Sequence, residues 1–179
     1  MTDPHTDPQC EVAHGRAPAA PAAPDTRTLV AVFASPVAGY LLRYGSDVGY
    51  RPVLLEPEGD RAAAGCPAGV KVVTGFAELS DPHADVVVTD HHRPELGPVL
   101  RDILAGLANW VGVMGSPRHP APHIPALTAL GVSAAGIARV HRPIGLNIGS
   151  RAPAEIAIAT IAGLIAERNG APGGFSFPA

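Results

Sequence analysis

Five short apolar runs constrain the fold of this chain more than any other feature. They are rich in valine, leucine and alanine and occupy residues 28–34, 51–56, 70–74, 85–89 and 110–114. Helical spacing appears between some of them, for example from Pro98 to Leu107, where apolar residues recur at steps of three and four. Strands without polar alternation are buried on both faces of a sheet. We therefore predict a single α/β domain, a Rossmann-like doubly wound parallel sheet with helices on both faces.

The predicted domain covers residues 27–169, between two segments of different composition. Residues 1–26 end in an Ala-Pro repeat, which denies the chain helical hydrogen bonds, so we expect a disordered arm. Residues 170–179 are expected to form a flexible tail, whose Phe175 and Phe177 are candidates for docking on the domain or on a partner. A helix over 156–165 is apolar nearly all round, which predicts burial against the sheet or in a homodimer contact.

Composition excludes several classes of function. The net charge of −3 offers no basic field for nucleic acid or an anionic membrane surface. Two cysteines, Cys10 and Cys66, do not form a disulfide framework, and we interpret Cys66 as a free loop cysteine rather than a sulfur carrier. No apolar run reaches the ~18 residues of a membrane span, and the N-terminus lacks the apolar core of a signal peptide. These features predict a soluble cytoplasmic protein.

The turn after the first run only partly matches the dinucleotide fingerprint. Its sequence Phe-Ala-Ser-Pro-Val-Ala-Gly retains the third glycine, Gly39, whereas Pro36 replaces the second and lacks an N–H for a pyrophosphate. Glu56 ends the second run, where an acidic residue would accept ribose hydroxyls. We favour a structural turn that starts a helix. NAD(P) binding through Ser35, Gly39 and Glu56 is the alternative.

Polar residues follow the fourth and fifth runs, at the edge of a parallel sheet where ligands bind. Asp90 and His91 are candidates for contact with a polar ligand, with His91 able to transfer a proton; a metal site or a helix-capping turn are the alternatives. After the fifth run, Gly115 permits close backbone approach, Ser116 suits a helix cap, and Arg118 offers a fork for phosphate.

A loop over 143–151 carries two further glycines before the last helix. Gly145 and Gly149 allow positive φ, so the loop can fold back over a pocket. Asn147 is a candidate hydrogen-bonding group for a ligand, and Arg151 lies beside a helix N-terminus that favours anions. The alternative is a packed loop in which Arg151 pairs with Asp90 or Glu56.

The segments 86–92, 110–118 and 141–156 resemble the Rossmann domain of the XdhC/CoxI family, the accessory proteins of xanthine dehydrogenase and carbon monoxide dehydrogenase. The resemblance implies a cofactor chaperone rather than a catalyst. Such a chaperone binds molybdenum cofactor (molybdopterin) and hands it to a molybdo-flavoenzyme of the xanthine dehydrogenase class. The implied crevice residues are Asp90, His91, Gly115, Ser116, Arg118, Asn147, Gly149 and Arg151.

Some features depart from the family pattern. The first turn is poor in glycine, the order of residues at 89–91 is changed, and prolines replace basic residues after Arg118. Two other functions stay open. An NAD(P)-binding oxidoreductase would show a spectral change with a nicotinamide. A non-catalytic interaction module would have its pocket filled by side chains such as Tyr40 or Trp110.

Overall fold

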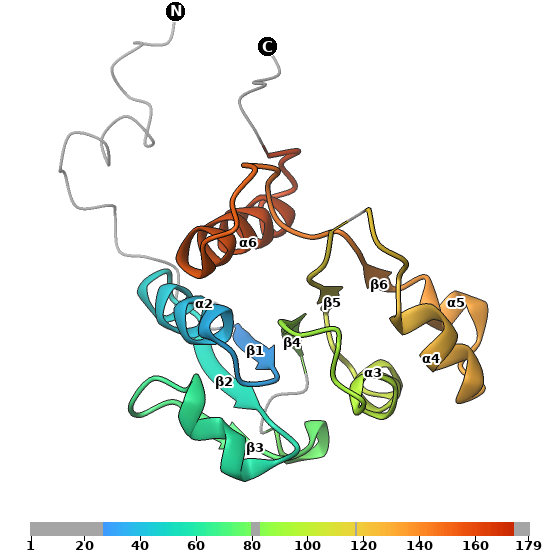
Figure 1. The fold of residues 1–179 in the computed structure, drawn as a ribbon. Helices are drawn as coiled ribbons and strands as arrows, with labels where there is room; N and C mark the ends of the chain where they lie inside the picture. Colours follow the sequence, from blue (N-terminus) through green and yellow to red (C-terminus); the bar gives the residue numbers. More distant parts are fainter. Residues whose placement is uncertain (1–26, 80–82, 117, 174–179) are drawn as a thin grey trace, which may run out of the picture.

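The domain is built on a six-stranded sheet in which every pair of neighbouring strands is parallel. The computed structural model describes residues 27–79, 83–116 and 118–173. The strand order is β3-β2-β1-β4-β5-β6 (Figure 1). The strands are β1 (Thr28–Val32), β2 (Arg51–Leu55), β3 (Lys71–Val73), β4 (Ala84–Val88), β5 (Trp110–Val113) and β6 (Val140–His141). This order confirms the predicted Rossmann-like fold. The chain builds the sheet outward from β1 to β3 on one side and from β4 to β6 on the other, so the topological switch point lies between β1 and β4.

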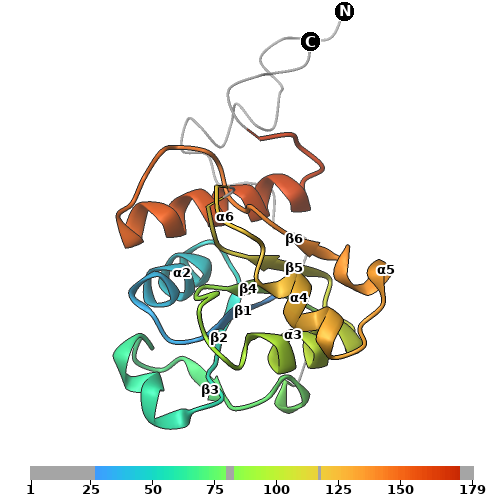
Figure 2. The same cartoon turned by 45° about the vertical axis from the view of Figure 1, so that its right-hand side comes forward.

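Helices cover both faces of the sheet and divide its core into two apolar clusters. On one face, α2 (Pro36–Asp47) and α6 (Pro153–Arg168) pack side by side (Figures 1 and 2). On the other face lie α3 (Leu96–Ala105) and α4 (His123–Ala129). Shorter elements are α5 (Ala134–Ile137) and the two 3-10 turns η1 (Gly59–Ala64) and η2 (Phe76–Glu78). Strands β1 and β4 are buried at every position, because both of their faces meet helices.

Helix ends follow the local signals in the sequence. Ser35 caps α2, since its Oγ accepts a hydrogen bond from Ala38 N at 3.0 Å, and Pro36 occupies the first turn. Pro153 starts α6, and the helix ends at Arg168, inside the stop signal expected at residues 167–170. One face of α6 is buried in the apolar cluster that it shares with the sheet and α2, which agrees with the predicted burial against the sheet. Ile158, on another face, is 53 % exposed.

The structure contains elements that the sequence patterns did not predict. Helix α4 begins in a stretch interpreted as breakers, with Pro122 at its N-cap and Pro125 in its first turn. Prolines fit there because first-turn N–H groups have no acceptor within the helix. The two-residue β6 is too short for a strand pattern. The predicted arm over 1–26, and residues 174–179 of the predicted tail, lie outside the described residues. None of the helices in the described parts of the chain is long and apolar enough to cross a membrane.

Candidate functional site

A pocket of about 670 Å³ opens beyond the carboxyl ends of β4 and β5. Thr89 and His91 line it after β4, and Met114, Gly115, Ser116 and Arg118 line it after β5. The loop 143–151, which we call the strap, forms a further wall, and the first half of α6 completes the pocket. Its volume lies in the range of small-molecule and cofactor sites, about 300–1,000 Å³.

The strap is seated on α6 through its glycines. Gly145 has φ +82°, and a Cβ at this position would lie 3.2 Å from the backbone of Ala159 and Thr160. The adjacent Leu146 N donates a hydrogen bond to Ala159 O at 3.1 Å. Gly149 also has positive φ, +70°. The positive φ expected of both glycines is therefore confirmed, and Gly145 is required by close helix packing as well.

The other end of the strap is fixed at the start of α6. Ser150 Oγ accepts a hydrogen bond from Ala152 N at 3.1 Å and donates one to Glu155 in the first turn of the helix. Arg151 lies between these contacts, is exposed, and lines the pocket. Its expected alternative, pairing with Glu56, is wrong because Glu56 binds a different arginine.

Arg142 holds the turn after β5 in place. Its Nη2 donates to Ser116 O at 3.0 Å and its Nη1 to His119 O at 3.3 Å. A Cβ on Gly115 would lie 2.7 Å from Arg142 Nη2, so a larger residue there would displace the guanidinium from its present place. Ser116 caps no helix, contrary to expectation. Its Oγ accepts from Arg118 N at 3.2 Å and shapes the turn instead.

The residues after β4 divide between the pocket and the surrounding structure. Asp90 Oδ1 accepts a hydrogen bond from His92 N at 2.9 Å, which forms a local turn. This turn does not cap a helix, because α3 begins at Leu96 with Glu95 as its N-cap. His91 lines the pocket, with its ring centroid 4.2 Å from that of His92. Burial lowers the pKa of His91, and the charges of His92 and Arg142 lower it further. His91 is therefore neutral at pH 7 and can both donate and accept a hydrogen bond.

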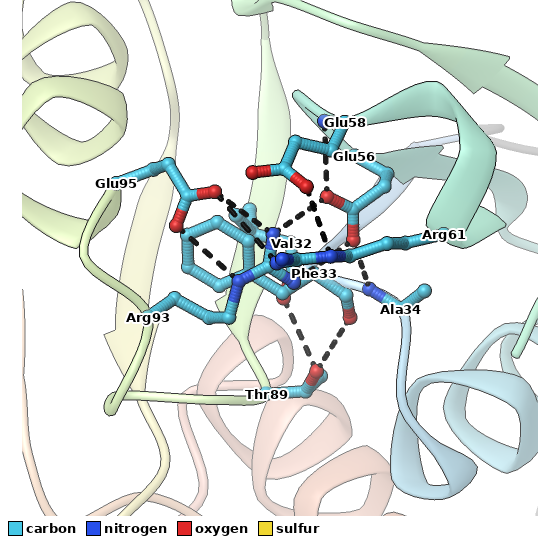
Figure 3. A network of polar contacts seen from close by, with 9 residues as sticks. All are labelled: Val32, Phe33, Ala34, Glu56, Glu58, Arg61, Thr89, Arg93 and Glu95. Carbon is cyan, nitrogen blue, oxygen red and sulfur yellow. Dashed lines mark hydrogen bonds and ion pairs between the residues drawn. The ribbon is translucent and has the colours of Figure 1, made fainter. Parts of the chain in front are cut away.

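The other side of the switch point, at the ends of β1 and β2, is closed by a polar network (Figure 3). Glu56 is fully buried, and its carboxylate accepts hydrogen bonds from Ala34 N at 2.8 Å and Glu58 N at 3.2 Å. Arg93 donates to both Glu56 oxygens, at 2.9 and 3.2 Å. The expected role of Glu56 as an acceptor for ribose hydroxyls is thus replaced by internal hydrogen bonds.

Arg93 also contacts two residues besides Glu56, namely Phe33 and Glu95. Its guanidinium lies 4.7 Å from the centroid of the Phe33 ring and donates to Glu95, whose pKa these hydrogen bonds lower to about 2. Phe33 is fully buried and adopts φ +70°, a conformation that favours glycine. Arg61 approaches from η1 and pairs with Glu58 at 2.9 Å. Ala34 N, a donor that the turn after β1 could offer to a pyrophosphate, is therefore already bound to Glu56.

Two other residues predicted at this turn serve the structure rather than the pocket. Ser35 caps α2, and its Oγ lies 2.9 Å from Thr89 Oγ1, which also contacts Phe33 O at 2.8 Å. Gly39 packs against a neighbouring loop, where an added Cβ would lie 2.9 Å from Gly65 O. The structure thus separates the predicted residues into two groups. Those that line the pocket are His91, Gly115, Ser116, Arg118, Gly145, Asn147, Gly149 and Arg151; those that do not are Ser35, Gly39, Glu56 and Asp90.

The pocket combines positive charge with an apolar lining. Arg118 and Arg151 are its charged residues, and no carboxylate belongs to its lining in the described chain. The apolar part, which sequence reasoning missed, comes from Val37, Met114, Ile144, Leu146, Ile148 and Ile156. Within the strap, apolar residues alternate with glycine and asparagine, and this alternation was the available signal. Among the described residues, no group of three histidine, cysteine or acidic side chains is placed to hold a metal ion.

Comparisons with known proteins agree on the domain type. A family model described as the XdhC Rossmann domain matches residues 29–164. The chain is 42 % identical over 89 residues to the uncharacterized protein YqeB of Escherichia coli K12, a match that covers 50 % of this chain and 16 % of YqeB. It also resembles a crystal structure described as a xanthine dehydrogenase from Bacillus halodurans, with a TM-score of 0.64 and 22 % identity. That match covers 81 % of this chain and 45 % of the other, so the chain spans less than half the length of each protein.

Proposed function

Because the chain belongs to the XdhC Rossmann-domain family, we propose that it binds molybdenum cofactor, or a related pterin nucleotide, in the pocket beneath the strap. In this proposal it assists the maturation of a molybdoenzyme of the xanthine dehydrogenase class. It acts as a cofactor-binding chaperone and not as a catalyst. The partner is the molybdo-flavoenzyme that receives the cofactor.

The charge of the pocket is the observation that carries this proposal. Molybdenum cofactor joins a flat polar ring system to a phosphate. Arg118 and Arg151 supply guanidinium groups for the phosphate, and no acidic side chain among the described lining residues opposes it. Asn147 and neutral His91 can donate to and accept from the edge of the ring.

The remaining lining supports a holding role. Met114 and Leu146 contribute apolar surface on which a planar ring can pack. The bound cofactor would supply the molybdenum centre that its target enzyme uses. This chain's own residues bind the phosphate, orient the ring and exclude water until transfer.

Two alternatives receive less support from the structure. An NAD(P)-dependent oxidoreductase would use the turn after β1, where the Glu56 carboxylate is already bound by Arg93 and by Ala34 N. An interaction module with a filled pocket was expected to use Tyr40 or Trp110. Neither side chain lines the pocket, since Tyr40 is 39 % exposed and Trp110 stacks on His141.

An anaerobic binding titration tests the proposal. The purified chain is titrated with molybdenum cofactor, alone and with NADP as a competitor, and Arg118→Ala, Arg151→Ala and Asn147→Ala are titrated alongside. Loss of a hydrogen bond to a charged group costs about 1.5–3 kcal/mol, so each arginine variant should bind about 10- to 100-fold more weakly. Arg43→Ala is the matched control, because Arg43 is an exposed arginine of α2 outside the pocket.

Two results would contradict the proposal. One is equal affinity of the wild type and both arginine variants, provided that their thermal melting is unchanged. The other is displacement of the cofactor by NADP, which would favour the oxidoreductase.

A further inference from the structure

A second, smaller cavity lies beside the strap, at the edge of the sheet. Its volume is about 220 Å³, which is below the range of cofactor sites and suits a single side chain. The lining comes from β5, from the outermost strand β6, from the strap and from the C-terminal half of α6. We call this cavity the edge groove.

One wall of the edge groove is a pair of stacked rings. Trp110 of β5 and His141 of β6 have ring centroids 5.1 Å apart and planes within 9° of parallel. An added Cβ on Gly112 would collide with the indole, so glycine at this position leaves the space that the Trp110 ring occupies. His141 is exposed and belongs to the outermost strand, so a group from solvent can reach this wall.

The charge in the edge groove is negative. Glu167, in the last turn of α6, is exposed and lines the groove, and the described lining contains no lysine or arginine. Within residues 27–79, 83–116 and 118–173, the Glu167 carboxylate forms no ion pair. Its neighbour Arg168 is used elsewhere, with its guanidinium carbon 5.5 Å from the centroid of the Tyr50 ring. The groove therefore offers a carboxylate and an aromatic surface to a cation from outside the described chain.

We propose that the edge groove binds a guanidinium group, presented by an arginine side chain of a partner protein. A guanidinium is planar and weakly hydrated, so it stacks on aromatic faces while its N–H groups donate to a carboxylate. The ammonium group of lysine has neither the flat face nor the fork of donors. Leu146 of the strap and Leu164 of α6 supply apolar surface for the methylene stem of the arginine.

The edge groove and the cofactor pocket share one wall. Residues 143–146 of the strap line both cavities, as does Thr160 of α6. An arginine seated in the groove therefore contacts the segment that also encloses the pocket. This contact needs no cofactor, so the inference can be tested separately from the proposed function.

Trp110 reports on the groove because it is the single tryptophan of the chain, and its indole N–H gives one NMR signal. The 15N-labelled chain is titrated, without cofactor and at constant ionic strength, with N-acetyl-arginine amide. The citrulline analogue, which has nearly the same shape and no charge, and the lysine analogue are titrated alongside. For the arginine compound we expect a saturating shift of the indole signal, with a Kd on the order of 1 mM for a ligand of this size. The lysine compound should bind more weakly, and the citrulline compound should give no saturating shift.

Two variants test the role of the carboxylate. Glu167→Gln removes the charge and keeps the shape, so the Kd of the arginine compound should rise about fivefold, as for an exposed ion pair. Asp47→Asn is the matched control, because Asp47 is an exposed carboxylate at the end of α2 that does not line the groove. Its Kd should equal that of the wild type. Far-ultraviolet circular dichroism shows whether each variant is folded.

Several results would overturn the inference. The citrulline or the lysine compound could bind as tightly as the arginine compound, or Glu167→Gln could leave the Kd unchanged. The indole signal could fail to approach saturation. Binding of free arginine without binding of the blocked compound would assign the groove to a free amino acid and not to a side chain of a partner protein.

Discussion

Replacing Arg93 by methionine removes the cation that balances Glu56 while preserving most of the side-chain volume. The Glu56 side chain is fully buried and that of Arg93 is 11 % exposed, so the carboxylate loses its counter-ion where water cannot replace it. Breaking such a pair costs about 3–5 kcal/mol. Ala34 N and Glu58 N still donate to the carboxylate after the substitution, so we expect the lower part of this range, about 3 kcal/mol.

Urea unfolding followed by far-ultraviolet circular dichroism measures this loss. With a slope of about 2 kcal/mol per molar urea, the midpoint should fall by about 1.5 M. Arg101→Met is the matched control, because Arg101 pairs with Asp102 on the surface of α3, with 48 % and 59 % of the two side chains exposed. An exposed pair contributes less than about 1 kcal/mol.

A double variant separates lost charge balance from lost packing. Glu56→Gln in the Arg93→Met background removes the unpaired charge, so it should recover at least about 1 kcal/mol. The reasoning is refuted if Arg93→Met unfolds within 1 kcal/mol of the wild type, or if the double variant is no more stable than Arg93→Met.

Two further predictions concern the strap and Tyr50, which lies in the apolar cluster on the α2 and α6 face of the sheet. Burial, together with the Asp85 carboxylate that accepts its hydrogen bond at 3.1 Å, raises the pKa of Tyr50 to about 12. The unfolded chain loses this proton near pH 10, so folding stability should fall as the pH rises from about 10 to 12. A spectrophotometric titration should show a late tyrosine phase, which Tyr50→Phe removes; a titration unchanged by this substitution would contradict the assignment. In the strap, Gly145→Ala should destabilise the fold more than Gly149→Ala in thermal melting. Both positions have positive φ, which costs an alanine about 1–2 kcal/mol, but only the Cβ at Gly145 meets the α6 backbone. An equal fall in melting temperature for the two variants would contradict this prediction, because it would mean that a Cβ at position 145 is not destabilised by the α6 backbone.

The two halves of the sheet edge have opposite character, and this contrast determines which ligand fits. At the ends of β1 and β2, Arg93 is the internal cation for Glu56, and Glu56 in turn binds the backbone N–H of Ala34 in the turn after β1. At the ends of β4 and β5, the strap encloses a pocket in which Arg118 and Arg151 have no carboxylate partner among the described lining residues. The fold therefore resembles a dinucleotide-binding domain whose usual binding turn is closed and whose neighbouring crevice is open.

The fold could be predicted from the sequence because its central strands are buried on both faces. The runs at 85–89 and 110–114 have apolar centres, and they correspond to β4 and β5 within one residue at each end. Local sequence patterns do not predict elements whose formation depends on tertiary contacts. Strand β6 has only two residues and exists because β5 offers it a parallel partner. Helix α4 starts among prolines that a helix interior would reject.

The candidate site was predictable to the extent that its residues follow strands or carry glycine. Gly145 and Arg151 were identified because a fold-back loop before a helix is visible in the sequence. The internal partner of Glu56 was not, since Arg93 lies 37 positions away and no spacing rule joins the two. Arg142 was missed for the same reason. It acts across 26 positions on Ser116 O, and its own neighbours in the sequence give no sign of this contact.

A crystal structure of the chain grown anaerobically with molybdenum cofactor tests the central claim most directly. The account predicts cofactor density beneath the strap, with its phosphate against Arg118 or Arg151 and its ring beside Asn147, and with the Arg93–Glu56 contact intact. Density against the turn after β1, with Arg93 displaced from Glu56, would contradict it.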